Sequence, residues 1–170
     1  IPPPPLNDSP QGAVLLFEYI YEQQSLPLYE PLLTSDFRYT FSVASDPELV
    51  DRYPNWGRDD EVESTRHLFE GFQNIAGQTV PRASRITLDL TGLQYGPDYT
   101  HPDSAGWYQR VVVTSVDLTI EVGEVTYQVS GRHELYVVRG DAAVLDEGQE
   151  ARPDRWYLRR WDDLSPRLAT

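Results

Sequence analysis

Histidines are the side chains of this 170-residue sequence best suited to acid–base chemistry, because a neutral imidazole can take up a proton near pH 7. His133 lies in a segment whose alternation of side chains predicts a strand. The positions on its side of that strand are mostly apolar: Tyr127, Val129, Leu135 and Val137. His133 is therefore the candidate general base that we expect to face the interior.

His67 is the second candidate base. It stands one turn after Glu63 and two residues before the apolar Phe69 in an expected helix, so its side chain could border the interior. The alternative for both histidines is a structural role, in the core or at its rim. We expect that structural role for both.

Five further residues are candidates for binding a ligand: Tyr19, Tyr39, Trp56, Arg58 and Tyr127. Tyrosine hydroxyls can donate hydrogen bonds, and Arg58 beside Trp56 could bind a carboxylate. Each of these residues could instead have a purely structural role. Aromatic residues of a small domain usually pack in the core with the polar tip in water, and Arg58 could form an ion pair at the entry to a helix.

Other chemistries lack the residues that they need. The sequence has no Cys and no Lys, which excludes disulfides, thiolate metal sites, a cysteine nucleophile and a Schiff-base lysine. We expect no metal, because the histidines lack metal-ligand spacing and the acidic residues near Asp59 and Glu61 lack a calcium-loop pattern. Capping and the helix dipole account for those acidic residues. No phosphate loop or dinucleotide fingerprint is present, so we expect no cofactor.

The net charge limits the partners. The 27 acidic residues outnumber the 14 basic ones, and the formal charge of -13 repels phosphate backbones and anionic headgroups. We therefore expect no nucleic-acid partner. No stretch approaches the ~20 apolar residues that span a bilayer, so we expect no transmembrane segment and a soluble domain.

Three helices are expected in the first half of the chain. The first begins at Ser9-Pro10, an N-cap followed by proline at the first helical position, and ends near Gln24. A short helix follows at 28–33, and Asp59 caps the third. Three apolar residues mark the buried stripe of the third helix: Val62, Phe69 and Phe72.

Strands are expected where the apolar residues alternate, at 37–43, 84–93, 107–122, 125–139 and 155–161. Gly123-Glu124 predicts a tight hairpin turn between the two long strands. The more apolar side of 107–122 should face the helices, which places Asp117 outside. Early helices followed by an antiparallel meander predict an α+β domain with its helices on one face of the sheet.

The N-terminal segment is rich in proline. We divide the sequence into a leader or tether at 1–8, a domain at 9–163 and a tail at 164–170. Pro2–Pro5 favour a polyproline II conformation, so we expect residues 1–8 to make no contact with the core of their own domain. Exported or lipid-anchored domains often carry such a tether. Together with the start at Ile1 rather than Met, it predicts an exported protein in the periplasm, at the cell surface or outside the cell.

Several phrases resemble nuclear-transport-factor-2-like (NTF2-like) domains. They are the runs LFEYIY at 16–21 and YEPLLTSDFRY at 29–39, the segment Trp56–Glu61 and the ending Trp156–Asp163. In that family a helix, a short helix and the phrase L-L-x-x-D-F lead into the first strand. The resemblance implies three N-terminal helices packed in the hollow of a strongly curved antiparallel sheet, and is closest to uncharacterised exported bacterial members. It also implies that the catalytic groups of enzymes of this kind lie inside the cone.

Because no catalytic constellation is present, our first hypothesis is a non-catalytic binding or assembly domain with a small apolar ligand in the cone. The alternative is an isomerase, dehydratase or cyclase that uses His133 or His67 as its base. A second alternative is a repeating subunit of an extracellular homo-oligomer, with the leader pairing to a neighbouring copy.

Overall fold

The computed structural model describes residues 1–40, 55–97, 99–100, 108–140 and 152–164. Its helices are α1 (Pro10–Gln23), α2 (Leu26–Leu32) and α4 (Arg58–Glu70). The start of α1 is as expected, because the Ser9 hydroxyl accepts the Gly12 N–H over 2.9 Å and Pro10 follows the cap. Gln24 ends the helix in the left-handed conformation, at φ +51°.

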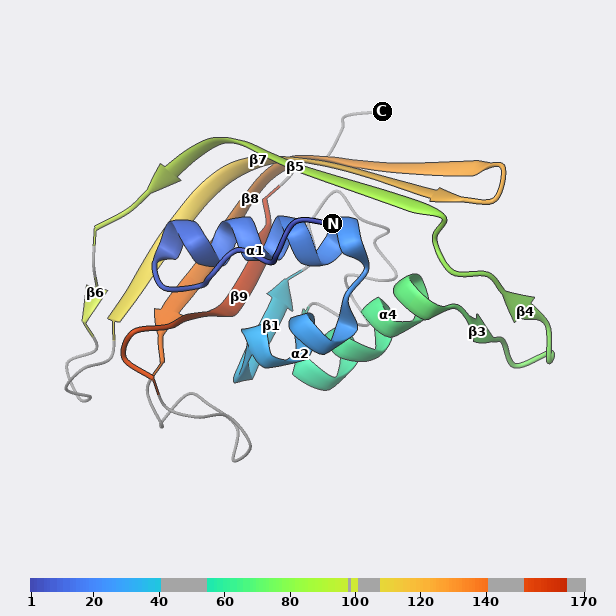
Figure 1. The fold of residues 1–170 in the computed structure, drawn as a ribbon, viewed down its shortest axis with the longest axis horizontal. Helices are drawn as coiled ribbons and strands as arrows, with labels where there is room; N and C mark the ends of the chain where they lie inside the picture. Colours follow the sequence, from blue (N-terminus) through green and yellow to red (C-terminus); the bar gives the residue numbers. More distant parts are fainter. Residues whose placement is uncertain (41–54, 98, 101–107, 141–151, 165–170) are drawn as a thin grey trace.

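The described strands are β1 (Leu33–Thr40), β2 (Asn55–Gly57), β3 (Phe72–Gln73), β4 (Thr79–Val80), β5 (Arg85–Tyr95), β6 (Tyr99–Thr100), β7 (Tyr108–Val122), β8 (Val125–Arg139) and β9 (Trp156–Asp163). The main sheet has the order β2-β1-β9-β8-β7-β5, with β6 also paired to β7, while β3 and β4 pair separately. The sheet arches over α1, and α2 and α4 lie below it (Figure 1). The predicted α+β class with a curved sheet is confirmed.

The predicted central hairpin is also confirmed. Strands β7 and β8 pair antiparallel from Val122↔Val125 at the turn to Gln109↔Val138 at the far end. Irregular register bends the sheet, most clearly in β5, where the pairing with β7 shifts between Thr91 and Gln94. Asp117 is exposed, as expected, and accepts a hydrogen bond from Gln128 on β8.

One strand pair departs from the antiparallel expectation. Strands β1 and β9 run parallel, whereas the other described pairs are antiparallel. Adjacent strands in an antiparallel meander need only short turns, but the two strands of this pair come from opposite ends of the domain. The long chain between them permits the parallel direction.

The core lies between α1 and the concave face of the sheet. Strand β5 supplies Ile86, Leu88 and Leu90, which are buried and alternate with exposed residues. Five α1 side chains that face this sheet are also buried: Ala13, Val14, Phe17, Ile20 and Tyr21. The apolar residues that recur at helical spacing in α1 and at alternate positions in β5 therefore pack together in one core.

Several element boundaries differ from the sequence prediction, and the second helix spans Leu26–Leu32 rather than 28–33 because Leu33 already belongs to β1. The third helix begins at Arg58 with Gly57 as its N-cap, because the Asp60 carboxylate accepts the Gly57 N–H over 3.3 Å. Phe72 lies beyond the helix, in β3. The first strand starts at Leu33 rather than at residue 37, because Leu33 already pairs with Leu158 of β9. Residues 41–43 of the predicted strand lie outside the described residues.

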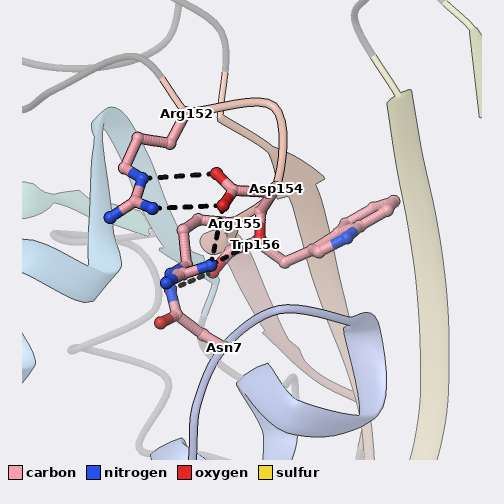
Figure 2. A network of polar contacts seen from close by, with 5 residues as sticks. All are labelled: Asn7, Arg152, Asp154, Arg155 and Trp156. Atoms are coloured by element: carbon pink, nitrogen blue, oxygen red, sulfur yellow. Dashed lines mark hydrogen bonds and ion pairs between the residues drawn. The ribbon is translucent and has the colours of Figure 1, made fainter.

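Residues 1–8 are held against their own domain by hydrogen bonds, whereas we expected a leader that makes no contact with the core and is free of the domain. The Asn7 amide donates to the Trp156 carbonyl over 2.7 Å, and the Trp156 N–H donates to the Asn7 carbonyl over 2.8 Å. Asn7 lies below the Arg152–Asp154–Arg155 cluster at the start of β9 (Figure 2). The Tyr19 hydroxyl also donates to the Pro2 carbonyl over 2.9 Å. Prolines lack N–H donors but keep their carbonyl acceptors, and the prediction overlooked this capacity.

Candidate functional site

A cavity of about 420 Å³ lies where α4, β3 and β4 approach the concave face of the main sheet. Its position corresponds to the interior of the cone that the resemblance implies. Described residues from nine helices and strands and the adjoining Pro81 line it: Tyr21, Tyr39, Trp56, Glu61, Ser64, Thr65, His67, Leu68, Phe72, Val80, Pro81, Leu118, Val122, Tyr127 and Trp161. Ser64 and Tyr127 are exposed, so the rim of the cavity meets solvent.

Glu61 is the buried acid of this cavity, with only 4% of its surface exposed. Its Oε1 accepts the Tyr29 hydroxyl over 2.8 Å and the Thr65 hydroxyl over 3.4 Å. Its Oε2 accepts the Trp56 indole N–H over 2.8 Å. Three donors from three parts of the chain therefore fix this carboxyl group at the cavity wall.

Burial dominates the electrostatics of the Glu61 site. Loss of water raises the pKa of Glu61 above its usual value, although the hydrogen bonds from Tyr29, Trp56 and Thr65 oppose that rise. Burial also raises the pKa values of Tyr21, Tyr29 and Tyr39, and the nearby negative charge of Glu61 adds to the rise. These tyrosines therefore keep their hydroxyl protons and stay hydrogen-bond donors at neutral pH.

Packed aromatic rings form the wall beside Glu61. The rings of Tyr39 and Trp161 meet edge to face at 82°, with centroids 5.1 Å apart. The ring centroids of Tyr39 and Trp56 are 5.7 Å apart, and those of Tyr21 and Trp161 are 6.2 Å apart. Such edge contacts hold large side chains in fixed orientations, so the wall is preformed.

The candidate base His67 lies at the rim of the cavity. Its Nε2 is 2.9 Å from Glu63 Oε1, and its ring stacks on Phe72 with centroids 4.1 Å apart. More than a third of its side chain is exposed. His67 therefore combines a ligand-accessible position with a partner on its own helix.

The candidate base His133 lies beneath the cavity wall and is not among the described residues that line the cavity. Only 1% of its surface is exposed, and its Nδ1 accepts the Trp161 indole N–H over 2.7 Å. Its Nε2 is 3.4 Å from Asp163 Oδ1. Because Nδ1 accepts, the proton of the neutral ring belongs on Nε2. His133 thus contacts a cavity residue, Trp161, from behind.

The five candidate ligand-binding residues divide into two groups. Tyr39, Trp56 and Tyr127 line the cavity. Tyr19 and Arg58 lie elsewhere: the Tyr19 hydroxyl binds the leader, and Arg58 donates from Nη2 to the Glu30 carbonyl over 2.7 Å. The structure therefore gathers three of the five, with His67, around a group that the sequence analysis did not select.

Glu61 is that group: it lies in the first turn of α4, as the sequence analysis expected, but its carboxyl group is also buried in the cavity wall. The helical spacing held a usable signal, because Glu61, Thr65 and Phe69 recur every four residues and all three are buried. A charged residue on a buried helical stripe needs partners inside the fold, which makes it a candidate for a functional site. Tyr21 and Trp161 were also missed, because nothing local separates a cavity aromatic from a core aromatic.

The described residues form neither a metal site nor a membrane-spanning helix. Within the described residues, no group of three or more His, Cys, Asp or Glu side chains is arranged to hold a metal ion. No helix in this part of the chain has the length and apolar character needed to cross a membrane.

Solved structures define the class of this fold. No family model and no curated protein sequence matches the chain. A conserved protein from Planctomyces limnophilus aligns over 93% of this chain and 94% of its own, with a TM-score of 0.56 and 9% identity. An NTF2-like superfamily protein from Salmonella enterica serovar Typhimurium aligns over 93% and 89%, with a TM-score of 0.52 and 12% identity. The chain therefore has the NTF2-like fold.

A further similar structure is a provisionally assigned scytalone dehydratase from Novosphingobium aromaticivorans. It aligns over 89% of this chain and 78% of its own, with a TM-score of 0.54 and 10% identity. At this identity the likeness extends to the fold alone. NTF2-like folds occur in binding domains and in isomerase or dehydratase enzymes, so the site must decide between these functions.

Proposed function

We propose that this domain binds a small, mainly apolar molecule in the cone cavity, with Glu61 as the polar anchor. The observation that carries the proposal is the placement of one fixed carboxyl group in a cavity with preformed aromatic walls. Ligand sites commonly combine apolar walls with a few polar groups that orient the bound molecule. The volume of about 420 Å³ lies within the usual range for such sites.

Titration with the neutral fluorescent dye N-phenyl-1-naphthylamine tests this proposal. We expect saturable binding that Ser64→Trp weakens at least about tenfold, because Ser64 is exposed at the rim and an indole there would block entry. Glu70→Trp is the matched control, since Glu70 is exposed on the same helix away from the cavity. Dye affinity that Ser64→Trp leaves unchanged, or no saturable binding at all, would count against the proposal.

A second candidate function is proton transfer, as in an isomerase or dehydratase. One observation favours it: a carboxyl group with a raised pKa shares its surroundings with tyrosines that stay protonated. In this version Glu61 takes the role of base that the sequence analysis gave to His133 or His67. Deuterium exchange at the α-carbons of cyclic ketones, followed by NMR, tests it. Exchange should be lost in Glu61→Gln and kept in His133→Gln, and the reverse would restore the original assignment.

We also propose that the domain acts outside the cytoplasm, and that it forms homo-oligomers there. The proline-rich segment 2–5 supports export, because such segments commonly separate a domain from a membrane anchor. Fractionation of the source cells, with antibody detection, tests the location. Light scattering of the purified domain tests the oligomer, and a mass equal to one chain would contradict it.

A further inference from the structure

The charged side chains that line the cavity favour negative over positive charge. Glu61 is the only acidic residue among the described residues that line it, and no Arg is among them. His67 is the basic side chain among these lining residues, and its Nε2 lies 2.9 Å from Glu63 Oε1 at the rim. An anionic ligand would meet the Glu61 carboxylate without a cationic partner, so the cavity disfavours anions.

Glu61 also has unused capacity to accept hydrogen bonds. A carboxylate offers about four lone-pair directions, and the donors Tyr29, Thr65 and Trp56 occupy three of them. A ligand that enters the cavity removes further water from this group. A neutral ligand would leave its negative charge uncompensated, whereas a cation would neutralise it.

The aromatic wall suits the same type of ligand. The Tyr39 and Trp161 rings stand at 82° and form a corner, which Trp56 extends at an angle of 41° to Tyr39. Aromatic rings attract ammonium groups through the negative potential of their faces, and rings set at steep angles surround such a group from several sides. Glu61 binds the Trp56 indole directly, so the carboxylate adjoins this corner.

The charge of the whole chain acts in the same direction. A formal charge of -13 raises the local concentration of cations and lowers that of anions. The local charge of the cavity, its aromatic geometry and the overall field thus agree. From them we infer that the ligand of this cavity is an organic ammonium ion with an apolar body, held between Glu61 and the Tyr39–Trp56–Trp161 corner. The inference rests on the proposed small-molecule binding function.

A pair of isosteric probes separates charge from shape. The cation (4-hydroxyphenyl)trimethylammonium and the neutral 4-tert-butylphenol differ only in a nitrogen that replaces a carbon. We expect isothermal titration to show the wild-type domain binding the cation at least about tenfold more tightly. In Glu61→Gln this preference should fall at least about tenfold, because the cation loses its counter-charge while the neutral probe binds at least as tightly as in the wild-type domain.

The sign of the pH dependence gives a second readout. Cation binding favours the ionised form of Glu61, so affinity for the cation should rise between about pH 5 and about pH 7.5, and affinity for the neutral probe should fall. Among the residues that the structure describes, the other titratable groups around the site are Tyr21, Tyr29, Tyr39, Tyr127, His67 with its partner Glu63 and, close to Tyr39, Asp163. Repeating the titration in His67→Gln isolates the rim histidine, and we expect the rise to persist there.

The outcomes separate the two levels of the argument. If the neutral probe binds as tightly as the cation, or if Glu61→Gln keeps the cation preference, the ammonium assignment is overturned while the binding function stands. If neither probe nor the naphthylamine dye binds, the binding function itself fails. Cation binding that Ser64→Trp does not weaken would place the cation outside the cavity and would also overturn the assignment.

Discussion

Trp161 donates its indole N–H to His133 Nδ1 over 2.7 Å, and this bond joins a cavity residue to the buried histidine behind it. The indole can donate only, so the neutral imidazole must accept at Nδ1. Burial lowers the pKa of His133, although the charge of Asp163 opposes that effect. His133 thereby holds one ring of the cavity wall in place.

His133→Leu should destabilise the fold, because it leaves the buried Trp161 N–H without an acceptor. We expect the free energy of unfolding in urea to fall by about 1–3 kcal/mol. His67→Leu is the matched control. His67 lies at the rim with a surface partner, so its loss should cost less than about 1 kcal/mol. Equal losses in the two variants would show that the indole bond contributes little.

Glu61→Gln should change how stability depends on pH. Burial raises the pKa of Glu61 in the folded state, so the folded state holds this proton more tightly than the unfolded state does. Its contribution to stability is then fully present below the usual value of 4.5 and is lost as the pH rises through the raised pKa. Gln imitates the protonated acid, so the difference in Tm between Glu61→Gln and wild type should grow in favour of the variant from about pH 5 to about pH 8. A constant difference would show that Glu61 is not perturbed.

Tyr29→Phe removes one of the two shortest hydrogen bonds to Glu61. The hydroxyl of Tyr29 is buried with its acceptor, so its removal should lower the free energy of unfolding at neutral pH by about 1.5–3 kcal/mol. Tyr136→Phe is the control, because Tyr136 donates to Glu134 over 3.0 Å at a half-exposed position of β8. That variant should lose less than about 1 kcal/mol. The reverse order would contradict the assignment of Glu61 as a buried anion.

Gly12→Ala should release the leader from the domain. A methyl group at Gly12 would overlap the carbonyl oxygen of Leu6, so residues 1–7 would have to move away from α1. We expect faster hydrogen exchange at the Trp156 N–H, which the Asn7 carbonyl accepts in the wild-type protein. Gln11→Ala, at an exposed position of the same helix, should leave that exchange unchanged. If the Trp156 N–H stays protected from exchange in both variants, the hydrogen bond to the Asn7 carbonyl does not depend on the packing of Leu6 against Gly12.

Patterns that depend on neighbouring residues were readable from the sequence. The Ser9 cap, the alternation in β5 and the turn at Gly123 were predictable, because capping bonds, pleating and tight turns act within a few residues. These local signals, with the NTF2-like phrases, were sufficient for the α+β class and the central hairpin. The outward position of Asp117 followed from the same alternation.

Contacts between distant segments could not be read in this way. Tyr127 and Val129 share the apolar side of β8 with His133, yet both are exposed while His133 is buried. The difference arises because Leu135 and Val137, beyond His133, lie in the core, whereas the turn end of the hairpin extends past it. Alternation shows which residues share a side of the strand. Only the folded structure shows how much of that side the rest of the domain buries.

The three helices, the five longer strands and three of the six Tyr, Trp and Phe residues that line the cavity were predictable from the residues alone, because side-chain type and spacing dictate local conformation. The folded arrangement was needed to place Glu61 at the centre of the candidate site and His133 behind its wall. The physical reason is that burial and pKa belong to the surroundings of a group. The surroundings of Glu61 combine Tyr29 from α2, Trp56 from β2 and Thr65 from α4, which only folding brings together.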